Sequence, residues 1–183
     1  CEAPSNFEAH PFWNRVSLSW ETSNMGFLDT LTYGESYSTR IGTNDADTFT
    51  VAIRFTPSEL SSANGQYLSH VAFIPGETTV HEFTIKIWVG GSHPDASTFN
   101  EGTLVSSEVV LPSQVTPASW NVIPLSTPVL IDATQELWIG YECTATGGYP
   151  AGAGADNVIN GTNDLIVFGG NWTTLASSSL TYG

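Results

Sequence analysis

Apolar and polar residues alternate along several short segments of the chain. In the segment 49–55, every second residue is large and apolar, namely Phe49, Val51, Ile53 and Phe55. The segment 136–143 repeats this pattern with Leu137, Ile139, Tyr141 and Cys143. A period of two is what a β-strand with one buried face requires. Similar runs predict further strands at 15–21, 68–74, 81–89, 103–111, 122–125, 129–131 and 164–168.

One segment carries a helix signal. Thr56, Pro57, Ser58 and Glu59 follow the strand at 49–55 and have the form of a capping box with Pro at the first helical position. We therefore expect one short helix from Pro57 to about Ala63. Together these elements predict an all-β fold, a jelly-roll-like β-sandwich of antiparallel strands with one short helix.

The net charge of the chain limits the classes of partner that it can bind. Four Lys and Arg residues stand against 18 acidic residues, so the formal net charge is −14. A nucleic acid or an anionic membrane surface would be repelled, whereas divalent cations and neutral glycans remain compatible. The sequence contains no run of 18 apolar residues, so we expect no membrane span.

The two cysteines, Cys1 and Cys143, allow three interpretations. A disulfide between them is expected if the export route is oxidising. Alternatively, Cys1 is the lipidated residue that remains when a lipoprotein signal is removed. In the third interpretation, Cys143 is a plain buried thiol.

Catalytic signatures are missing from the sequence, and we predict that the protein is not an enzyme. The chain has no Gly-x-Ser-x-Gly, His-Glu-x-x-His, Cys-x-x-Cys or Gly-x-Gly-x-x-Gly motif. The strands at 68–74 and 81–89 would form a hairpin, and their alternation places His70 and His81 on opposite faces of it. A carboxylate pair for glycoside cleavage stays open, because such a pair is defined by its separation in space.

Oxygen-rich loops are candidates for structural Ca²⁺. Asp45 and Asp47 precede a strand, and a Gly-rich loop carries Asp156, Asn157, Asn163 and Asp164. Carboxylate and amide oxygens are ligands that Ca²⁺ prefers. The same short side chains also form the local hydrogen bonds of turns, which is the alternative explanation.

Aromatic side chains are candidates for ligand binding. Trp88 and Trp138 each lie between aliphatic residues in a predicted strand, so both point to the face opposite the aliphatic set. Together with Tyr149 and Trp172, which we expect in loops, they would form a platform on which sugar rings stack. In the alternative, the large rings are buried in the protein.

The order of the strand sequences resembles one family. From Ile41 onward the chain contains FTVAIRF, FTIKIWVGG, SWNVIPL, PVLID, ELWIGY, GGYPAG and NWTTL. This series resembles the β-sandwich modules of secreted and surface proteins of Bacteroidetes, which are appended to peptidases and hemagglutinin-like adhesins. The opening CEAPSNFEAH and the later RVSLSWE are similar to the first two strands of a fibronectin type III domain.

The resemblance implies a domain organisation and a modification site. Residues 1–35 would be fibronectin type III-like strands and a linker, and residues 36–183 the β-sandwich module. A further strand would be expected after Gly183. Asp29, Thr30 and Leu31 resemble the O-glycosylation motif of Bacteroidetes, which implies a glycan on Thr30.

The resulting hypothesis is a non-catalytic module, extracellular or at the cell surface, that supports adhesion by recognising a glycan or a protein. Three alternatives follow. The chain would be a structural subunit that assembles through an open sheet edge by strand donation. It would be an accessory domain of a secreted peptidase, or a hydrolase whose carboxylate pair the sequence does not show. Structural Ca²⁺ is the one cofactor that the loops suggest.

Overall fold

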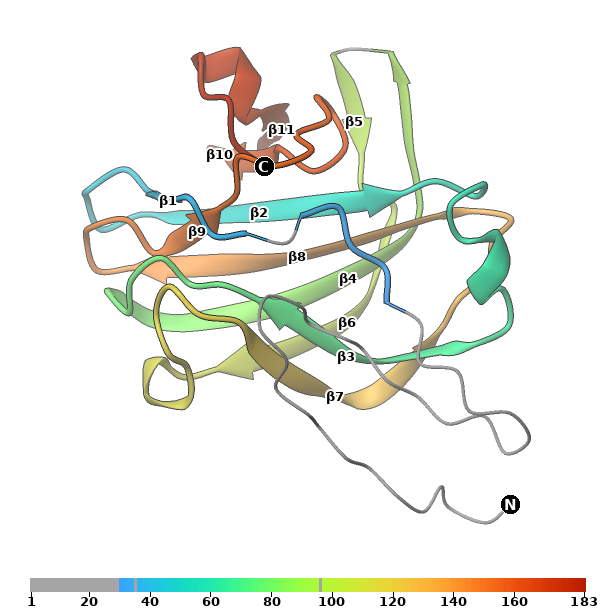
Figure 1. Ribbon diagram of the computed structural model, residues 1–183, viewed down its shortest axis with the longest axis horizontal. Coiled ribbons are helices and arrows are strands. Elements are labelled where there is room, and N and C mark those ends of the chain that lie inside the picture. Colours follow the sequence, from blue (N-terminus) through green and yellow to red (C-terminus); the bar gives the residue numbers. More distant parts are fainter. Residues whose placement is uncertain (1–29, 35, 96) are drawn as a thin grey trace.

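The computed structural model describes residues 30–34, 36–95 and 97–183 and has an all-β fold (Figure 1). The strands are β1 (Thr39–Ile41), β2 (Thr48–Phe55), β3 (Tyr67–Phe73), β4 (Val80–Asp95), β5 (Thr98–Asn100), β6 (Thr103–Val110), β7 (Asn121–Leu130), β8 (Glu136–Ala145), β9 (Ala151–Ala153), β10 (Leu165–Phe168) and β11 (Asn171–Thr174). Three 3₁₀ helices accompany them, η1 (Ser61–Ala63), η2 (Pro112–Gln114) and η3 (Leu175–Ser178). The predicted strand at 15–21 and the segment 1–29 lie outside the described residues.

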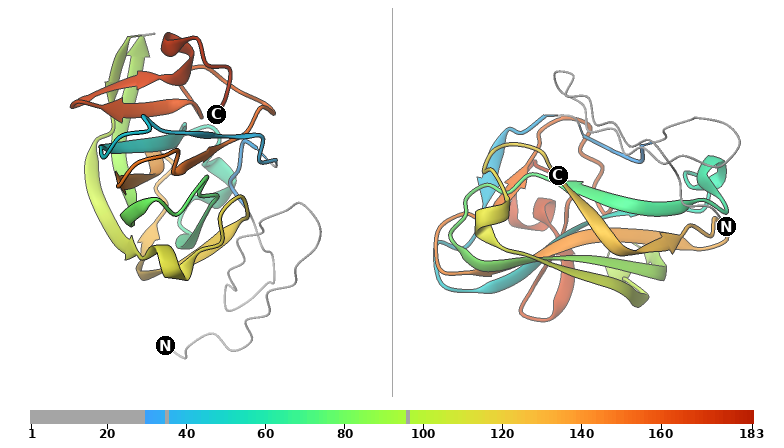
Figure 2. Two further views of the ribbon diagram at one scale, coloured as in Figure 1. Left: turned by 90° about the vertical axis from the view of Figure 1, so that its left-hand side faces the viewer. Right: turned by 90° about the horizontal axis from the view of Figure 1, so that it is seen from below.

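The strands form a nearly closed antiparallel barrel and not the clear two-sheet sandwich that the sequence predicted. The main sheet has the order β11-β10-β2-β8-β4-β5, and β6 also pairs with β4. Two shorter sheets, β3-β7 and β1-β9, continue the wall. Figure 2 shows how the strands curl around one interior.

Local contacts hold the short sheets together where no strand ladder joins them. Between β6 and β7, the carboxylate of Glu108 accepts hydrogen bonds from the backbone N–H and the hydroxyl of Ser126, at 2.7 and 2.5 Å. Between the end of β3 and β9, the N–H of Gly152 donates to the carbonyl of Ile74 at 3.1 Å. The N–H of Gly76 also donates to the carbonyl of Pro150 at 2.8 Å. A few local contacts at each seam therefore stand in place of a full ladder of backbone hydrogen bonds.

The predicted alternation places the core inside the barrel. The inward residues of β2 and β8 join those of β3 and β4 in one apolar cluster that includes Phe49, Phe55, Phe73, Phe83, Ile85, Ile87, Leu137 and Cys143. Burial of apolar surface on this scale is the main driving force for folding. Leu31 and Tyr33, which precede the expected module boundary, also pack against this cluster.

The outer face of the main sheet is covered as well. Ala52, Trp88, Trp138 and Leu165 form a second buried cluster on the face opposite the barrel interior, and Phe99 and Trp172 pack against it. These residues come from β2, β4, β8, β10 and the β5 and β11 strands that stand above the sheet in Figure 1. The two covered faces explain why β8 is buried on both faces over residues 137–141.

The predicted helix does not form as an α-helix. Its capping contact is present, since Glu59 accepts hydrogen bonds from the backbone N–H and the hydroxyl of Thr56 at 2.8 and 2.6 Å. However, the chain continues only as turns and the 3₁₀ helix η1. Ser61, Ser62 and Asn64 are poor helix formers, and Gly65 has a φ of +78° that ends any helix.

Two predictions about strand pairing are also corrected. The strands β3 and β4 do not form a hairpin, because β3 pairs with β7 and β4 pairs with β8, β6 and β5. The two runs expected at 122–125 and 129–131 are a single strand, β7. Its Pro124 and Pro128 are tolerated because β7 has a strand ladder on one edge alone, toward β3.

Candidate functional site

An apolar cavity of about 170 Å³ lies inside the barrel and opens to one side. One wall comes from the inward faces of β2 and β8, and the other from β3 and β9. An engineered apolar cavity of about 150 Å³ is large enough to hold benzene, so this volume suits one aromatic or a few aliphatic groups. The apolar residues around it include Val51, Ile53, Val71, Phe73, Ile74, Trp120, Ile139 and Leu175.

The cavity leaves core positions incompletely packed. Val51 and Ile53 point inward from β2, yet both side chains are only partly buried. Phe73 and Tyr141 face them and are buried, with their ring centroids 4.7 Å apart. Protein interiors are ordinarily close-packed, so exposed inward-facing aliphatic side chains mark a space that another apolar group would fill.

The buried polar side chains around the cavity already have hydrogen-bond partners. The hydroxyl of Tyr141 donates to the carbonyl of Ile74 at 3.2 Å and accepts from the N–H of Gly152 at 3.1 Å. Its burial raises the pKa of Tyr141 well above the usual value, so the phenol stays neutral. Among the described residues, every buried side-chain nitrogen or oxygen has a hydrogen-bond partner. The chemistry of the interior therefore favours an apolar ligand group.

Residues 32–34 and Ser36 border the mouth of the cavity and carry two carboxylate contacts. Tyr33 stacks on Phe55 at 4.9 Å, and its hydroxyl contacts Glu59 Oε1 at 2.6 Å and the carbonyl of Arg54 at 2.9 Å. At the other end of the segment, the hydroxyl of Ser36 donates to Asp156. Glu59 and Asp156 are both exposed, so the mouth is flanked by negative charge.

The strand β3 forms one side of this opening. It pairs with β7 along one edge. On its other edge, the described pairing begins only beyond the strand, at the bridge between Pro75 and Ala151. Ala72 and Ile74 line the cavity there. An edge of this kind is a ready site for the addition of a further strand.

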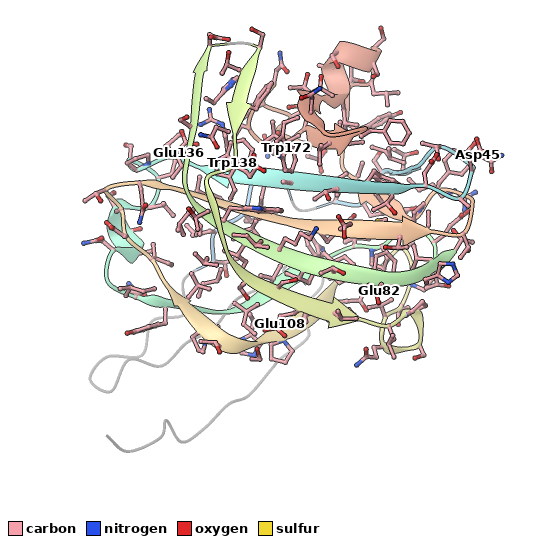
Figure 3. The ribbon with its side chains drawn as sticks, turned by 180° about the vertical axis from the view of Figure 1, so that it is seen from behind. Asp45, Glu82, Glu108, Glu136, Trp138 and Trp172 are labelled. Carbon is pink, nitrogen blue, oxygen red and sulfur yellow. The ribbon has the colours of Figure 1, made fainter. Side chains whose placement is uncertain are left out.

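The three predicted platform tryptophans come together, but as a packed cluster. Trp88 and Trp138 are direct cross-strand neighbours on β4 and β8, on the outer face as expected. Trp172 stands edge-on to both, with ring centroids 5.9 and 5.6 Å away. Figure 3 labels Trp138 and Trp172 next to each other. Trp138 is 0% exposed and Trp88 7%, which leaves these two rings little surface for a sugar.

Two other predicted aromatic placements differ in detail. Trp172 lies in β11 and not in a loop. Tyr149 does lie in the loop between β8 and β9, where its ring is exposed and Arg40 sits 5.9 Å from its centroid. Tyr149 is not part of the tryptophan cluster.

An ion pair ties the tryptophan cluster to the loop before β10. The indole N–H of Trp138 donates to Glu136 at 2.9 Å, and Arg54 contacts the other oxygen of Glu136 at 2.8 Å. Arg54 Nε also donates to the carbonyl of Gly161 at 2.6 Å. Gly161 is necessary here, because its φ is +75° and a Cβ would lie 2.6 Å from the ring of His93. We interpret these contacts as a network that joins the loop before β10 to the tryptophan cluster.

The oxygen atoms proposed for Ca²⁺ take part in the hydrogen bonds of their own loops. Asp164 is buried and accepts from the N–H of Gly161 at 2.7 Å, and Asn163 accepts from the N–H of Ile159 at 2.7 Å. In the loop before β2, Thr43 donates to Asp47 at 2.8 Å, next to the exposed Asp45. Asn157 has a φ of +53° in the same turn as Asp156. These contacts match the turn interpretation, and Ca²⁺ binding stays a prediction.

Two further predicted sites are only partly visible. Cys143 is a free thiol with no exposed surface in the barrel core, and burial raises its pKa well above the usual value. Its expected disulfide partner, Cys1, lies outside the described residues. Thr30 is partly buried at the beginning of the described chain, and Asp29 lies outside it.

Sequence reasoning did not identify the cavity. The alternation correctly places Val51, Ile53, Ile139 and Tyr141 on an inward face. Trp120 also lies at the cavity, where it is partly exposed. A period-two pattern shows which side chains point inward. It carries no signal that the opposite wall stands too far away to fill the space.

The comparisons add no family. No protein-family model, no curated protein and no solved structure matches this chain. Across the described ranges, no three His, Cys, Asp or Glu side chains are grouped so that they could hold a metal ion. The part of the chain that the structure describes has no helix long and apolar enough to cross a bilayer.

Proposed function

We propose that the protein is a non-enzymatic extracellular binding module that holds an extended, apolar segment of a partner protein in the barrel cavity, beside β3. The observation that carries this proposal is the half-open cavity of about 170 Å³ with its satisfied polar groups. An alternating strand presents large side chains on one face, which is the shape that such a cavity accepts.

The geometry favours a protein ligand over a glycan. Trp88 and Trp138 are buried against Trp172 and Phe99, so the expected sugar-stacking surface is largely covered. The buried polar side chains of the cavity already have hydrogen-bond partners, so they offer little to sugar hydroxyl groups. An apolar side chain loses its contact with water there and gains contacts on several sides.

Peptide binding to the whole chain tests this proposal. The probe is a peptide of about eight residues, an ordinary strand length, in which Val alternates with a polar residue. Trp120 lines the cavity, so its fluorescence should change on binding, and the change should disappear in Trp120→Phe.

Two matched substitutions locate the site. Val51→Phe adds apolar volume inside the cavity and should abolish peptide binding. Val109→Phe makes the same change at an exposed position of β6 and should leave binding intact. Equal binding by Val51→Phe and the wild-type chain would refute the site, and failure of the wild-type chain to bind any alternating peptide would refute the proposed function.

A further inference from the structure

The positive charges of the described chain are already paired. The residues that the structure describes include three Lys or Arg side chains. Arg40 pairs with Glu77, Arg54 with Glu136 at 2.8 Å, and Lys86 with Glu142 at 2.7 Å. Each of these cations is therefore paired with a carboxylate, and acidic side chains outnumber cations among the described residues.

Two of those acidic side chains lie beside the cavity mouth. Glu59 holds the hydroxyl of Tyr33, and Asp156 holds that of Ser36, so the carboxylates flank a segment that borders the opening. Burial acts to raise the pKa of Glu59, but hydrogen bonds from Thr56 and Tyr33 outweigh it and leave the pKa below its usual value. Glu59 is consequently ionised at neutral pH.

The net charge also bears on the occupant of the cavity. At −14, two copies of the chain repel each other, which disfavours a second copy as the source of the strand. A segment with Lys or Arg between its apolar residues would be attracted over a long range and would meet carboxylates at the mouth. Apolar side chains would fill the cavity while the cationic ones stay at the rim.

We propose that the occupant is an extended segment of a partner protein in which apolar residues alternate with Lys or Arg. This inference rests on the proposed function, because it specifies the chemistry of the segment that the same cavity binds. The apolar positions supply contact with the cavity, and the cationic positions supply selectivity and a fast rate of association.

Four peptides of equal length separate the contributions of the apolar and the cationic positions to binding. They alternate Val with Lys, Val with Ser, Val with Glu, and Ser with Lys. At low salt, the Val–Lys peptide should bind the whole chain about tenfold more tightly than the Val–Ser peptide, and this advantage should shrink as salt is added. The Val–Glu and Ser–Lys peptides should both bind more weakly than Val–Lys.

A matched pair of double variants tests whether the preference for the Val–Lys peptide comes from the carboxylates at the mouth of the cavity. Asp156→Asn with Glu59→Gln keeps the hydrogen-bonding shapes and should weaken Val–Lys binding about three- to tenfold without changing Val–Ser binding. Asp45→Asn with Glu82→Gln removes the same charge from residues that neither line the cavity nor bind a lining residue as Glu59 binds Tyr33, and it should have little effect. Figure 3 shows Asp45 and Glu82 near one end of the main sheet.

Each alternative outcome has a definite meaning. Equal affinity for the Val–Lys and Val–Ser peptides would overturn the inference and leave the proposed function standing. Equal weakening by the two double variants would overturn the assignment to Glu59 and Asp156. Binding of none of the peptides, together with a concentration-dependent dimer, would identify a second copy as the occupant and overturn the cationic partner.

Discussion

Asp164 shows how a single buried carboxylate shapes a turn at some cost to stability. Its side chain is 1% exposed and accepts the backbone N–H groups of Gly161 and Ala176, at 2.7 and 3.4 Å. Burial nevertheless raises the pKa of Asp164 above its ordinary value of 3.8, so burial outweighs these hydrogen bonds. The folded chain therefore binds this proton more tightly than the unfolded chain does.

This shift predicts a pH dependence that Asp164→Asn should remove. The stability gained by protonating Asp164 is complete below about pH 3.8, its ordinary pKa, and is lost as the pH rises through the higher folded pKa. In urea unfolding between neutral pH and about pH 4, the wild-type chain should therefore gain stability relative to Asp164→Asn as the pH falls. A difference in the free energy of unfolding between the wild-type chain and Asp164→Asn that stays constant over this pH range would contradict the raised pKa of Asp164.

At the residue scale, the sequence predicts orientation better than environment. Alternation placed Trp88 and Trp138 together on one face, and the structure has them as direct neighbours. It could not show that Trp172 and Phe99 cover that face, because Trp172 comes from a strand far along the chain and Phe99 from a strand that turns back beside β4. A buried tryptophan and an exposed tryptophan can lie in the same local sequence pattern of apolar and polar residues.

Among the elements, β6 and β7 meet through one side chain. Glu108 on β6 accepts two hydrogen bonds from Ser126 on β7, where a closed barrel would have a backbone ladder. Ser126 lies among residues 125–128 of β7, which are left unpaired where the register with β3 shifts between Leu68 and His70. The seam between β6 and β7 is thus a specific side-chain contact between two strands that share no backbone ladder with each other.

Glu108→Ala should open this seam. The substitution removes the acceptor for a backbone N–H and a hydroxyl, and we expect the free energy of unfolding to fall by about 1–2 kcal/mol. Amide exchange in β7 should become faster. Glu101→Ala is the matched control, because Glu101 lies between β5 and β6 and has no hydrogen bond in the described structure. Equal stability of the two variants would show that Glu108 does not join the strands.

Strand positions followed from the sequence more reliably than strand partners did. The predicted runs at 49–55 and 136–143 agree closely with β2 and β8. The hairpin between β3 and β4 was wrong, because a tight connection is favoured locally but β3 buries its apolar face by pairing with β7. Partner choice depends on contacts between distant segments, which period-two patterns do not encode.

For the whole molecule, the main consequence is that the barrel is not completely closed. The short sheets β3-β7 and β1-β9 meet the main sheet through isolated contacts, and the cavity of about 170 Å³ lies between their walls. The all-β class follows from the sequence, but a cavity depends on how far apart two walls settle. A strand-shaped, cationic ligand would complete both the core packing and the charge balance.

Amide hydrogen exchange in β3, measured on the whole chain with and without saturating Val–Lys peptide, tests strand addition most directly. If the peptide pairs with the edge of β3 that faces away from β7, the amides on that edge within residues 71–73 should exchange at least about tenfold more slowly. The amides of β11, which does not line the cavity, should keep their rates. Unchanged exchange in β3 at saturation would contradict the proposed binding site.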